Sequence, residues 1–338
     1  MRLSSQIVLC LVLTGMAHWQ TWAQEVEKPI LTVYTTSSFV AENGVGPKAE
    51  VLFEETCDCD LQFVEVEDST GILDRVRSEG DSSAADIILG IDNALVVEAQ
   101  NTGLIAEHEV DMGKLNLPLA WDNQRFLPYD FGFFAFIYDK LRTPNPPKSF
   151  EQLLEADDSL KIVIQDPQTS TTGLGFLLWV KALYGENAAA SWSKLAPKIH
   201  AVTKDWSEAY QMFLEREADL VLSYTTSPAF HMIVEKESKY QASPFKEGHG
   251  MQIEVAAILK AAKDPVLANL FMQFLAGESF QALIPTNNWM YPVLFPEEGL
   301  PAVFRNLVRP VKSLMIDAQG IADNKADWID EFNQRLNR

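Results

Sequence analysis

The architecture of this chain can be read from Ile30-Leu31-Thr32-Val33-Tyr34, a short β-branched run followed directly by the polar turn Thr35-Thr36-Ser37-Ser38. A short apolar run bounded by turn residues predicts a buried strand and a loop. The same order recurs at residues 85–90, 161–164 and 219–223, with amphipathic helices between them, for example over 71–78 and 208–216. Strands that alternate with helices predict an α/β fold of mostly parallel sheets flanked by helices.

The polar turns after these strands are the expected place for a ligand, because such sheets bind ligands beyond the carboxyl ends of their strands. Two other stretches, the aromatic run 131–138 and the alternating run 251–259, predict strands that cross between two lobes. We expect lobe 1 over residues 24–128 and 252–299 and lobe 2 over 129–251, with a ligand cleft between the lobes. The C-terminal helical segment, 300–338, is not assigned to either lobe.

The first 23 residues have the order of a cleavable secretory signal peptide. Arg2 precedes an apolar run over 7–13, and small and polar residues follow up to Ala23. This run is far shorter than the roughly 20 apolar residues that a membrane-spanning helix needs. We therefore exclude 1–23 from the fold, and the remainder of the 338-residue chain is long enough for one large or two ordinary domains.

The chain is acidic, with a formal net charge of −20. This charge argues against nucleic acid or an anionic membrane surface as a partner, and it favours a cationic ligand only weakly, since acidity also serves solubility. Two cysteines follow the signal, Cys57 and Cys59. A local disulfide is our first interpretation, ahead of free thiols and of a metal pair, which would lack further ligands.

Catalytic signatures are missing from the sequence. There is no Gly-x-Ser-x-Gly, His-Glu-x-x-His or Walker motif, and Gly173-Leu174-Gly175 lacks the third glycine of a dinucleotide fingerprint. The histidines are scattered without the spacing of metal ligands. We expect neither an enzyme nor a metal site, and no cofactor.

Aromatic residues beside polar turns and two hydroxyl-rich helix starts are the candidates for binding. Trp206 and Trp289 stand on loops, where a large ring that only filled space would expose its apolar area. Ser170-Thr171 leads into an apolar helix, and Ser227-Pro228 has the form of an N-cap followed by a first helical residue. Helix starts bind anions through free amides, although ordinary capping is the commoner explanation of either one.

Taken together, these segments resemble the thiamine-binding periplasmic proteins, the solute-binding components of thiamine ABC importers. The resemblance covers nearly the whole chain after the signal, and two of its stretches are specific to the subfamily, Trp206-Ser-Glu-Ala-Tyr210 and Ser223-Tyr-Thr-Thr-Ser-Pro-Ala229. It also includes residues 31–35, 85–93, 128–136, 165–175 and 284–292.

The resemblance implies a two-lobed periplasmic binding protein, type II-like, that captures thiamine and its mono- and diphosphate without catalysis. It implies delivery to an inner-membrane ABC permease with its ATPase, and we expect a monomer in the periplasm. The ligand contacts that it implies are Asp68, Ser69, Ser170, Thr171, Trp206, Tyr224, Thr225, Thr226, Ser227 and Trp289. Thiazolium is a permanent cation and aminopyrimidine a flat ring, so a carboxylate, aromatic rings and hydroxylated helix starts suit this ligand.

The sequence departs from the family pattern at three places. The first loop reads Thr36-Ser37-Ser38 where the family has Tyr-Asp-Ser, Phe230 replaces a tyrosine, and no tryptophan stands near Asn43. The alternatives are a receptor of similar fold for iron or a polyamine and, from another class, a secreted hydrolase. Iron would call for adjacent tyrosines and a hydrolase for a nucleophile or paired acids, and the sequence has no motif for either.

Overall fold

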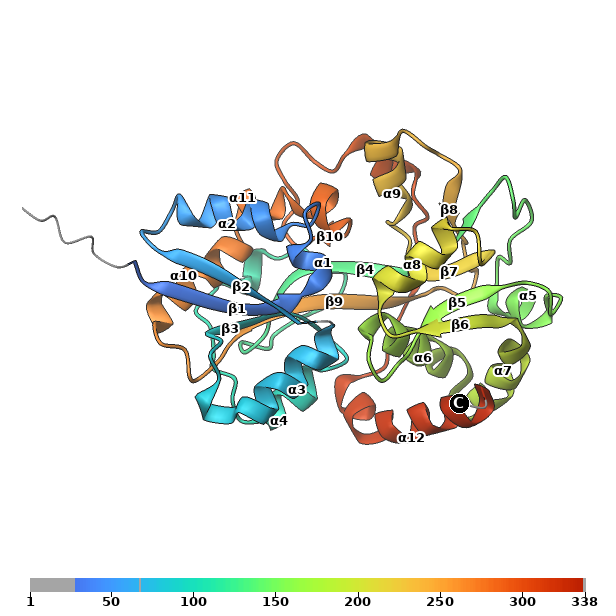
Figure 1. The fold of residues 1–338 in the computed structure, drawn as a ribbon, viewed down its shortest axis with the longest axis horizontal. Helices are drawn as coiled ribbons and strands as arrows, with labels where there is room; N and C mark the ends of the chain where they lie inside the picture. Colours follow the sequence, from blue (N-terminus) through green and yellow to red (C-terminus); the bar gives the residue numbers. More distant parts are fainter. Residues whose placement is uncertain (1–27, 67, 337–338) are drawn as a thin grey trace, which may run out of the picture.

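The computed structural model describes residues 28–66 and 68–336, and it has the predicted two-lobed α/β fold (Figure 1). Within this range eleven strands form one connected mixed sheet, whose main path is β2-β1-β3-β9-β4-β7-β5-β6. The predicted signal peptide, 1–23, lies outside the described residues. No helix of the described range is long and apolar enough to cross a membrane.

The first half of the sheet contains three parallel strands, at the left of Figure 1. Their bounds are Ile30–Thr36 for β1, Asp60–Val66 for β2 and Ile87–Asp92 for β3. The helices of this half are α1 (Ser37–Val40), α2 (Gly46–Glu54), α3 (Ser69–Glu79), α4 (Val96–Asn101), α10 (Pro265–Leu275) and α11 (Glu278–Gln281). Leu31 and Val33 pack in one core cluster and Tyr34 in the other, as the alternation of side chains along a strand requires.

The second half repeats this arrangement, at the right of Figure 1. β5 pairs in parallel with both β6 and β7. The strands are β5 (Ile162–Gln165), β6 (Ile199–Thr203) and β7 (Leu220–Tyr224), and the helices are α5 (Phe150–Glu155), α6 (Thr171–Tyr184), α7 (Ala188–Leu195) and α8 (Trp206–Leu214). The strands predicted at 161–164 and 219–223 and the helix predicted at 208–216 are therefore confirmed within two residues.

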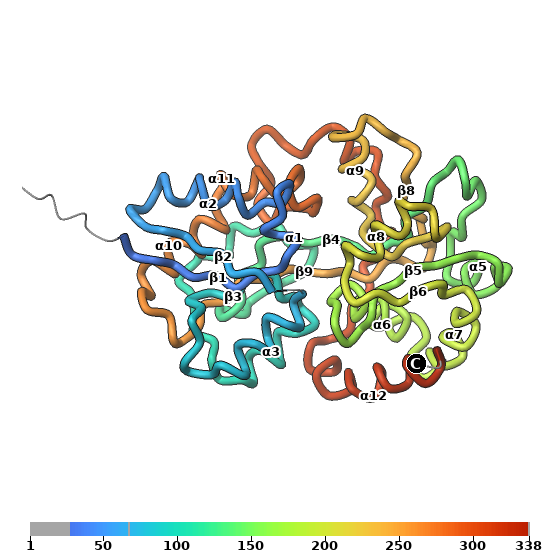
Figure 2. The backbone as a smooth tube through the Cα atoms, in the orientation of Figure 1, coloured from blue at the N-terminus to red at the C-terminus, as the bar shows by residue number. Residues whose placement is uncertain are grey.

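Two long strands connect the halves, β4 (Leu127–Asp139) and β9 (His249–Ile258), and Figure 2 shows both running between them. They are antiparallel to each other, β9 also pairs with β3, and β4 also pairs with β7. The expectation of parallel pairing thus holds inside each half but not at the crossing strands. The lobe boundaries themselves remain a prediction. The other short elements include α9 (Pro228–Phe230), β8 (Tyr240–Ala242), β10 (Tyr291–Pro292) and β11 (Ser313–Leu314), with π-helical turns after α9 (His231–Glu235) and before β10 (Ile284–Asn288).

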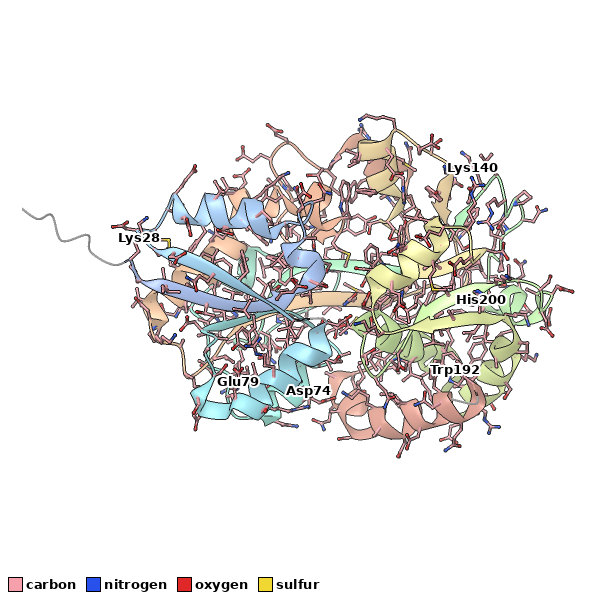
Figure 3. The ribbon with its side chains drawn as sticks, in the orientation of Figure 1. Lys28, Asp74, Glu79, Lys140, Trp192 and His200 are labelled. Carbon is pink, nitrogen blue, oxygen red and sulfur yellow. A yellow bond between two sulfur atoms is a disulfide. The ribbon has the colours of Figure 1, made fainter. Side chains whose placement is uncertain are left out.

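The C-terminal helix α12 (Ala318–Leu336) contacts helices of both halves. The ring of Phe332 lies 5.0 Å from that of Trp192 on α7, which Figure 3 labels. Lys325 pairs with Glu98 on α4, in the other half. The segment that the sequence left unassigned therefore lies against both.

Cys57 and Cys59 form a disulfide beside the loop that leads into β2, close to the labelled Lys28 in Figure 3. This agrees with the first of the three interpretations of the cysteine pair. The disulfide lies at the outer end of the sheet, away from the crossing strands.

Candidate functional site

A cavity of about 330 Å³ lies where the two halves of the sheet meet. Its size falls in the range of pockets that enclose small organic ligands, about 300–1,000 Å³. Most of the predicted contacts line it: Asp68, Ser69, Thr171, Trp206, Tyr224, Ser227 and Trp289. Among the described residues no lysine or arginine lines this cavity.

Three of the predicted contacts do not line the cavity. Ser170, Thr225 and Thr226 are fully buried. In the described part of the chain the hydroxyls of Thr225 and Thr226 have no hydrogen-bond partner, whereas the Ser170 hydroxyl is close enough to Asp68 to lower the pKa of that carboxyl. Thr225 lies where β7 ends, with its backbone N–H donated to the Phe133 carbonyl at 2.8 Å. These three residues form a layer behind the cavity wall, so their predicted role in direct contact stays a prediction.

The helix start at Thr171 is brought to the cavity by two glycines in α6. A side chain at Gly173 would approach the Gln165 carbonyl oxygen to 2.5 Å, and one at Gly175 would overlap the ring of Phe134. Glycine at both positions lets α6 pack directly on β4 and on the end of β5. Gly173 and Gly175, which do not form a dinucleotide fingerprint, are therefore needed for close packing of α6.

Asp68 is the N-cap of α3, and it also touches the start of α6 in the other half. Its Oδ1 accepts the Ser69 N–H at 2.6 Å and the Thr171 N–H at 3.4 Å. The hydroxyls of Ser69 and Thr171 are 3.4 Å apart, and Ser69 Oγ donates to the Gly90 carbonyl. Two elements more than a hundred residues apart in the chain thus meet at one carboxylate.

Burial dominates the electrostatics of this acidic side. It raises the pKa of Asp68 to about 6, although the hydrogen bonds from Ser69 and Thr171 act in the opposite direction. Burial likewise raises the pKa of Asp92 to about 7, with the charges of Glu254 and Asp68 adding to it. Asp92 Oδ2 accepts from Gln252 Nε2 at 3.0 Å. A cationic ligand would lower both pKa values, because it favours the charged carboxylates.

Trp206 forms an aromatic wall with Tyr210, one turn later on α8. Their rings stack at 4.9 Å and 27°. The indole N–H of Trp206 donates to Ser223 Oγ at 2.8 Å, and the Tyr210 hydroxyl lies 2.9 Å from Nε2 of the buried His231. Each polar tip has a partner, as buried Trp and Tyr require, which leaves the rings fixed beside the cavity.

Ser227 does not act as the helix cap that the sequence suggested. It precedes Pro228, the first residue of α9, as expected, but its side chain makes no cap hydrogen bond and α9 is only three residues long. Its backbone is helical rather than extended, so its hydroxyl turns back to accept the Tyr224 N–H at 3.1 Å and to meet Ser223 Oγ at 2.7 Å. This turn offers the cavity a hydroxyl that does not cap the helical segment after it, which consists of α9 and the π-helical residues His231–Glu235.

Trp289 lies in a left-handed backbone conformation, with φ 57°, which is rare for a bulky residue. Its N–H donates to the Ile284 carbonyl at 2.9 Å and closes the preceding π-helical turn. Phe230 packs edge-on against its ring at 5.3 Å and 87°. Such strain is found at functional sites when surrounding contacts hold it.

The positions that depart from the family pattern all face the cavity: Thr36, Ser37, Ser38, Asn43 and Phe230 line it. Thr36 and Ser38 hydroxyls are 3.2 Å apart. The departures therefore change the lining itself and not a remote surface.

Glu254 and Asn288 also line the cavity, but neither was predicted from the sequence as a ligand contact. Asn288 Nδ2 lies 3.3 Å from Glu254 Oε2 and 2.5 Å from Asp130 Oδ2. Glu254 could have been noticed in the sequence, because it is an acid in a mostly apolar run. In the structure it is the one partly exposed residue of β9, whose other residues are all buried. An acid in an otherwise buried strand calls for a partner or a function.

The chain is similar in sequence and in fold to known proteins. The family of bacterial extracellular solute-binding proteins matches residues 34–282. The thiamine-binding periplasmic protein of Escherichia coli is 48% identical over 311 residues, covering 92% of this chain and 94% of that protein. The protein of that name from Brucella abortus is 46% identical over 306 residues, covering 90% and 91%. The solved structure of a periplasmic thiamin binding protein superposes with a TM-score of 0.89 at 46% identity, covering 97% and 100% of the two chains.

Proposed function

The chain belongs to the family of bacterial extracellular solute-binding proteins, and on this premise we propose that it captures thiamine in the periplasm and delivers it to an inner-membrane ABC permease with its ATPase. We extend the proposal to thiamine monophosphate and diphosphate as ligands. The relatives that are named for thiamine binding match nearly the whole of this chain and of their own. The proposal includes export by the signal peptide at 1–23, action as a monomer, and neither catalysis nor a cofactor or nucleic-acid partner.

One observation carries the ligand assignment: the cavity combines carboxylates with aromatic rings and has no lysine or arginine in its described lining. Asp68 and Glu254 can offset the permanent charge of thiazolium. Trp206, Tyr210 and Trp289 offer ring faces to flat heterocycles, and a cation over an indole face gains about 0.5–2 kcal/mol. A ligand without a positively charged group would leave these acids without a partner.

The phosphate esters are supported by the start of α6, whose 14 residues make it a full helix with free amides at its N-terminus. Thr171 N–H points at Asp68 at present, over a long 3.4 Å contact. A phosphate at this position would replace the carboxylate as the acceptor. The turn Tyr224–Ser227 contributes hydroxyls, and Ser227 makes no cap hydrogen bond to the helical segment that follows it.

Native mass spectrometry of the protein as purified tests ligand and class together. We expect a retained mass equal to thiamine or one of its phosphates, and calorimetric titration of the emptied protein should give tight one-to-one binding. Ferric ion and spermidine, titrated in parallel, represent the alternative receptors. Tight binding of either one, with no response to thiamine, would reject the proposal.

A further inference from the structure

Three acids from neighbouring strands lie in one row across the sheet. Glu254 on β9 pairs in register with Asp130 on β4 and with Asp92 on β3. Residues directly opposite each other on antiparallel strands project from the same face, with Cβ atoms about 4.5–5.5 Å apart. Asp92 and Asp130 are buried, whereas Glu254 is only partly buried and lines the cavity. Glu254 is thus the member of the row that a ligand can reach.

One oxygen of Glu254 is already used by the protein. Tyr129 donates its hydroxyl to Oε2 at 2.9 Å, and Asn288 Nδ2 lies 3.3 Å from the same atom. No amide, hydroxyl or amino group of the described residues donates to Oε1, and the other group that hydrogen-bonds Glu254 is the Asp130 carboxyl. The side chain is therefore held at one oxygen and presents the other, an arrangement suited to accept a hydrogen bond from a ligand.

The pKa values of Asp130 and Glu254 are shifted by different neighbours. Burial, together with the charge and hydrogen bond of Glu254, raises the pKa of Asp130 well above its usual range. Burial also raises the pKa of Glu254, but hydrogen bonds from Asp130, Tyr129 and Asn288 act against that rise. These hydrogen bonds favour the charged form of Glu254, the residue of the pair that lines the cavity.

Trp289 and Glu254 line the same cavity, so a ligand that lies against the indole ring can reach this carboxylate. Asn288, which contacts Glu254, is the neighbour of Trp289 in the chain, and the closed turn at Ile284 fixes both residues. The quaternary nitrogen of thiazolium has no N–H to donate. The exocyclic amino group of aminopyrimidine has two.

We propose that Glu254 determines specificity in this cleft by accepting, at Oε1, a hydrogen bond from the amino group of the ligand's pyrimidine ring, which lies against Trp289. This inference rests on the proposed function and identifies which part of the ligand is read. An analogue with an oxo group in place of the amino group would present an oxygen to the carboxylate and be rejected.

Calorimetric titrations with thiamine and with oxythiamine, the oxo analogue, test the assignment. Because a hydrogen bond to a charged group contributes about 1.5–3 kcal/mol, the unaltered protein should prefer thiamine about 10- to 100-fold. Glu254→Gln should bring the two affinities to within about threefold, because its amide can rotate and donate to the oxo group. Asp68→Asn, the matched control, should weaken both ligands and leave their ratio unchanged.

A preference that survives Glu254→Gln, or an unaltered protein that binds both ligands equally, would overturn the inference and leave thiamine capture standing. Failure of the unaltered protein to bind thiamine would instead overturn the proposed function. If Glu254→Gln does not fold, a thiamine analogue with hydrogen in place of the amino group decides the matter on the unaltered protein. It should bind at least tenfold more weakly than thiamine, and equal binding would refute the role of Glu254.

Discussion

The aromatic and the acidic sides of the cleft are held in different ways. Trp206 donates to Ser223, and Tyr210 reaches His231, so the partners of the aromatic wall come from β7 and from the π-helical turn that follows α9. Asp68, in contrast, lies on α3 and accepts from Thr171 on α6, in the opposite half of the sheet. One wall is built within a half, and the other exists only where the halves meet.

A ligand therefore meets different parts of the site when the two halves are apart and when they are together. The aromatic wall needs no movement of one half against the other, so it should be formed in an open protein as well. The Asp68 contact depends on approach of the two halves, and a ligand that favours it would shift the population toward the closed state. The following changes separate the two contributions, beginning with the largest.

Asp68→Asn should cost the most binding free energy, because it removes a carboxylate that both faces the ligand and bridges the halves. Truncating one partner of a buried charged pair costs about 2–5 kcal/mol. Titration calorimetry with thiamine measures the loss, and Asp74→Asn, on the exposed side of the same helix, is the control. A loss below a few tenths of a kcal/mol would remove Asp68 from the binding site.

Asp92 should make the ligand-free protein less stable as the pH rises. Its folded pKa of about 7 lies above its ordinary 3.8, so its contribution to stability is complete below about pH 4 and is lost as the pH rises through 7. One pKa unit corresponds to about 1.4 kcal/mol, which makes the full loss on the order of 4 kcal/mol and the part between pH 5 and pH 8 about 3 kcal/mol. Urea unfolding at pH 5 and pH 8 measures it.

The Asp92→Asn variant is the control for that pH dependence. It keeps the shape of the side chain and cannot ionise, so its free energy of unfolding should vary less between the two pH values. The assignment to Asp92 is wrong if the parent and the variant have the same pH dependence.

Trp206→Ala and Trp289→Ala should each weaken thiamine by about 0.5–2 kcal/mol before packing is counted. The loss is smaller than for Asp68 because the rings act on the cation without carrying a charge. Thiamine should also quench the tryptophan fluorescence of the parent. Fluorescence titration measures both effects, and Trp192→Phe, in the core under α12, should leave the affinity unchanged. Unaltered binding in both alanine variants would show that neither ring touches the ligand.

The double substitution Ser170→Ala with Thr171→Ala should have the smallest effect. It should change the ratio of the affinities for thiamine monophosphate and thiamine. A hydroxyl contributes about 0.5–1.5 kcal/mol through a neutral hydrogen bond and about 1.5–3 kcal/mol through one to a charged phosphate. If the α6 start holds phosphate, thiamine monophosphate should lose more affinity than thiamine. Calorimetry with both ligands gives the ratio in parent and variant. An equal loss for the two ligands would mean that these residues maintain the cleft's shape, and the phosphate role of this turn should be abandoned.

Much of the fold followed from local pattern. The β-branched run at 30–34, the aromatic run at 131–138 and the apolar helix ended by Gly185 all lie within confirmed elements, because hydrophobic period and helix-ending residues act over short distances along the chain. Site residues that carry a motif, such as Trp206 in Trp-Ser-Glu-Ala-Tyr, were also named from the sequence and line the cavity.

Only the tertiary structure decided which way each side chain points and which residues it contacts. Thr225 and Thr226 stand beside Ser227 in the same turn, yet they are buried behind the wall while Ser227 lines it. Glu254 reaches the cavity because strand register places it beside Asp130 and Asp92. Short-range periodicity carries no information on which strands pair or at what register, and these pairings set which side chains meet across the cleft.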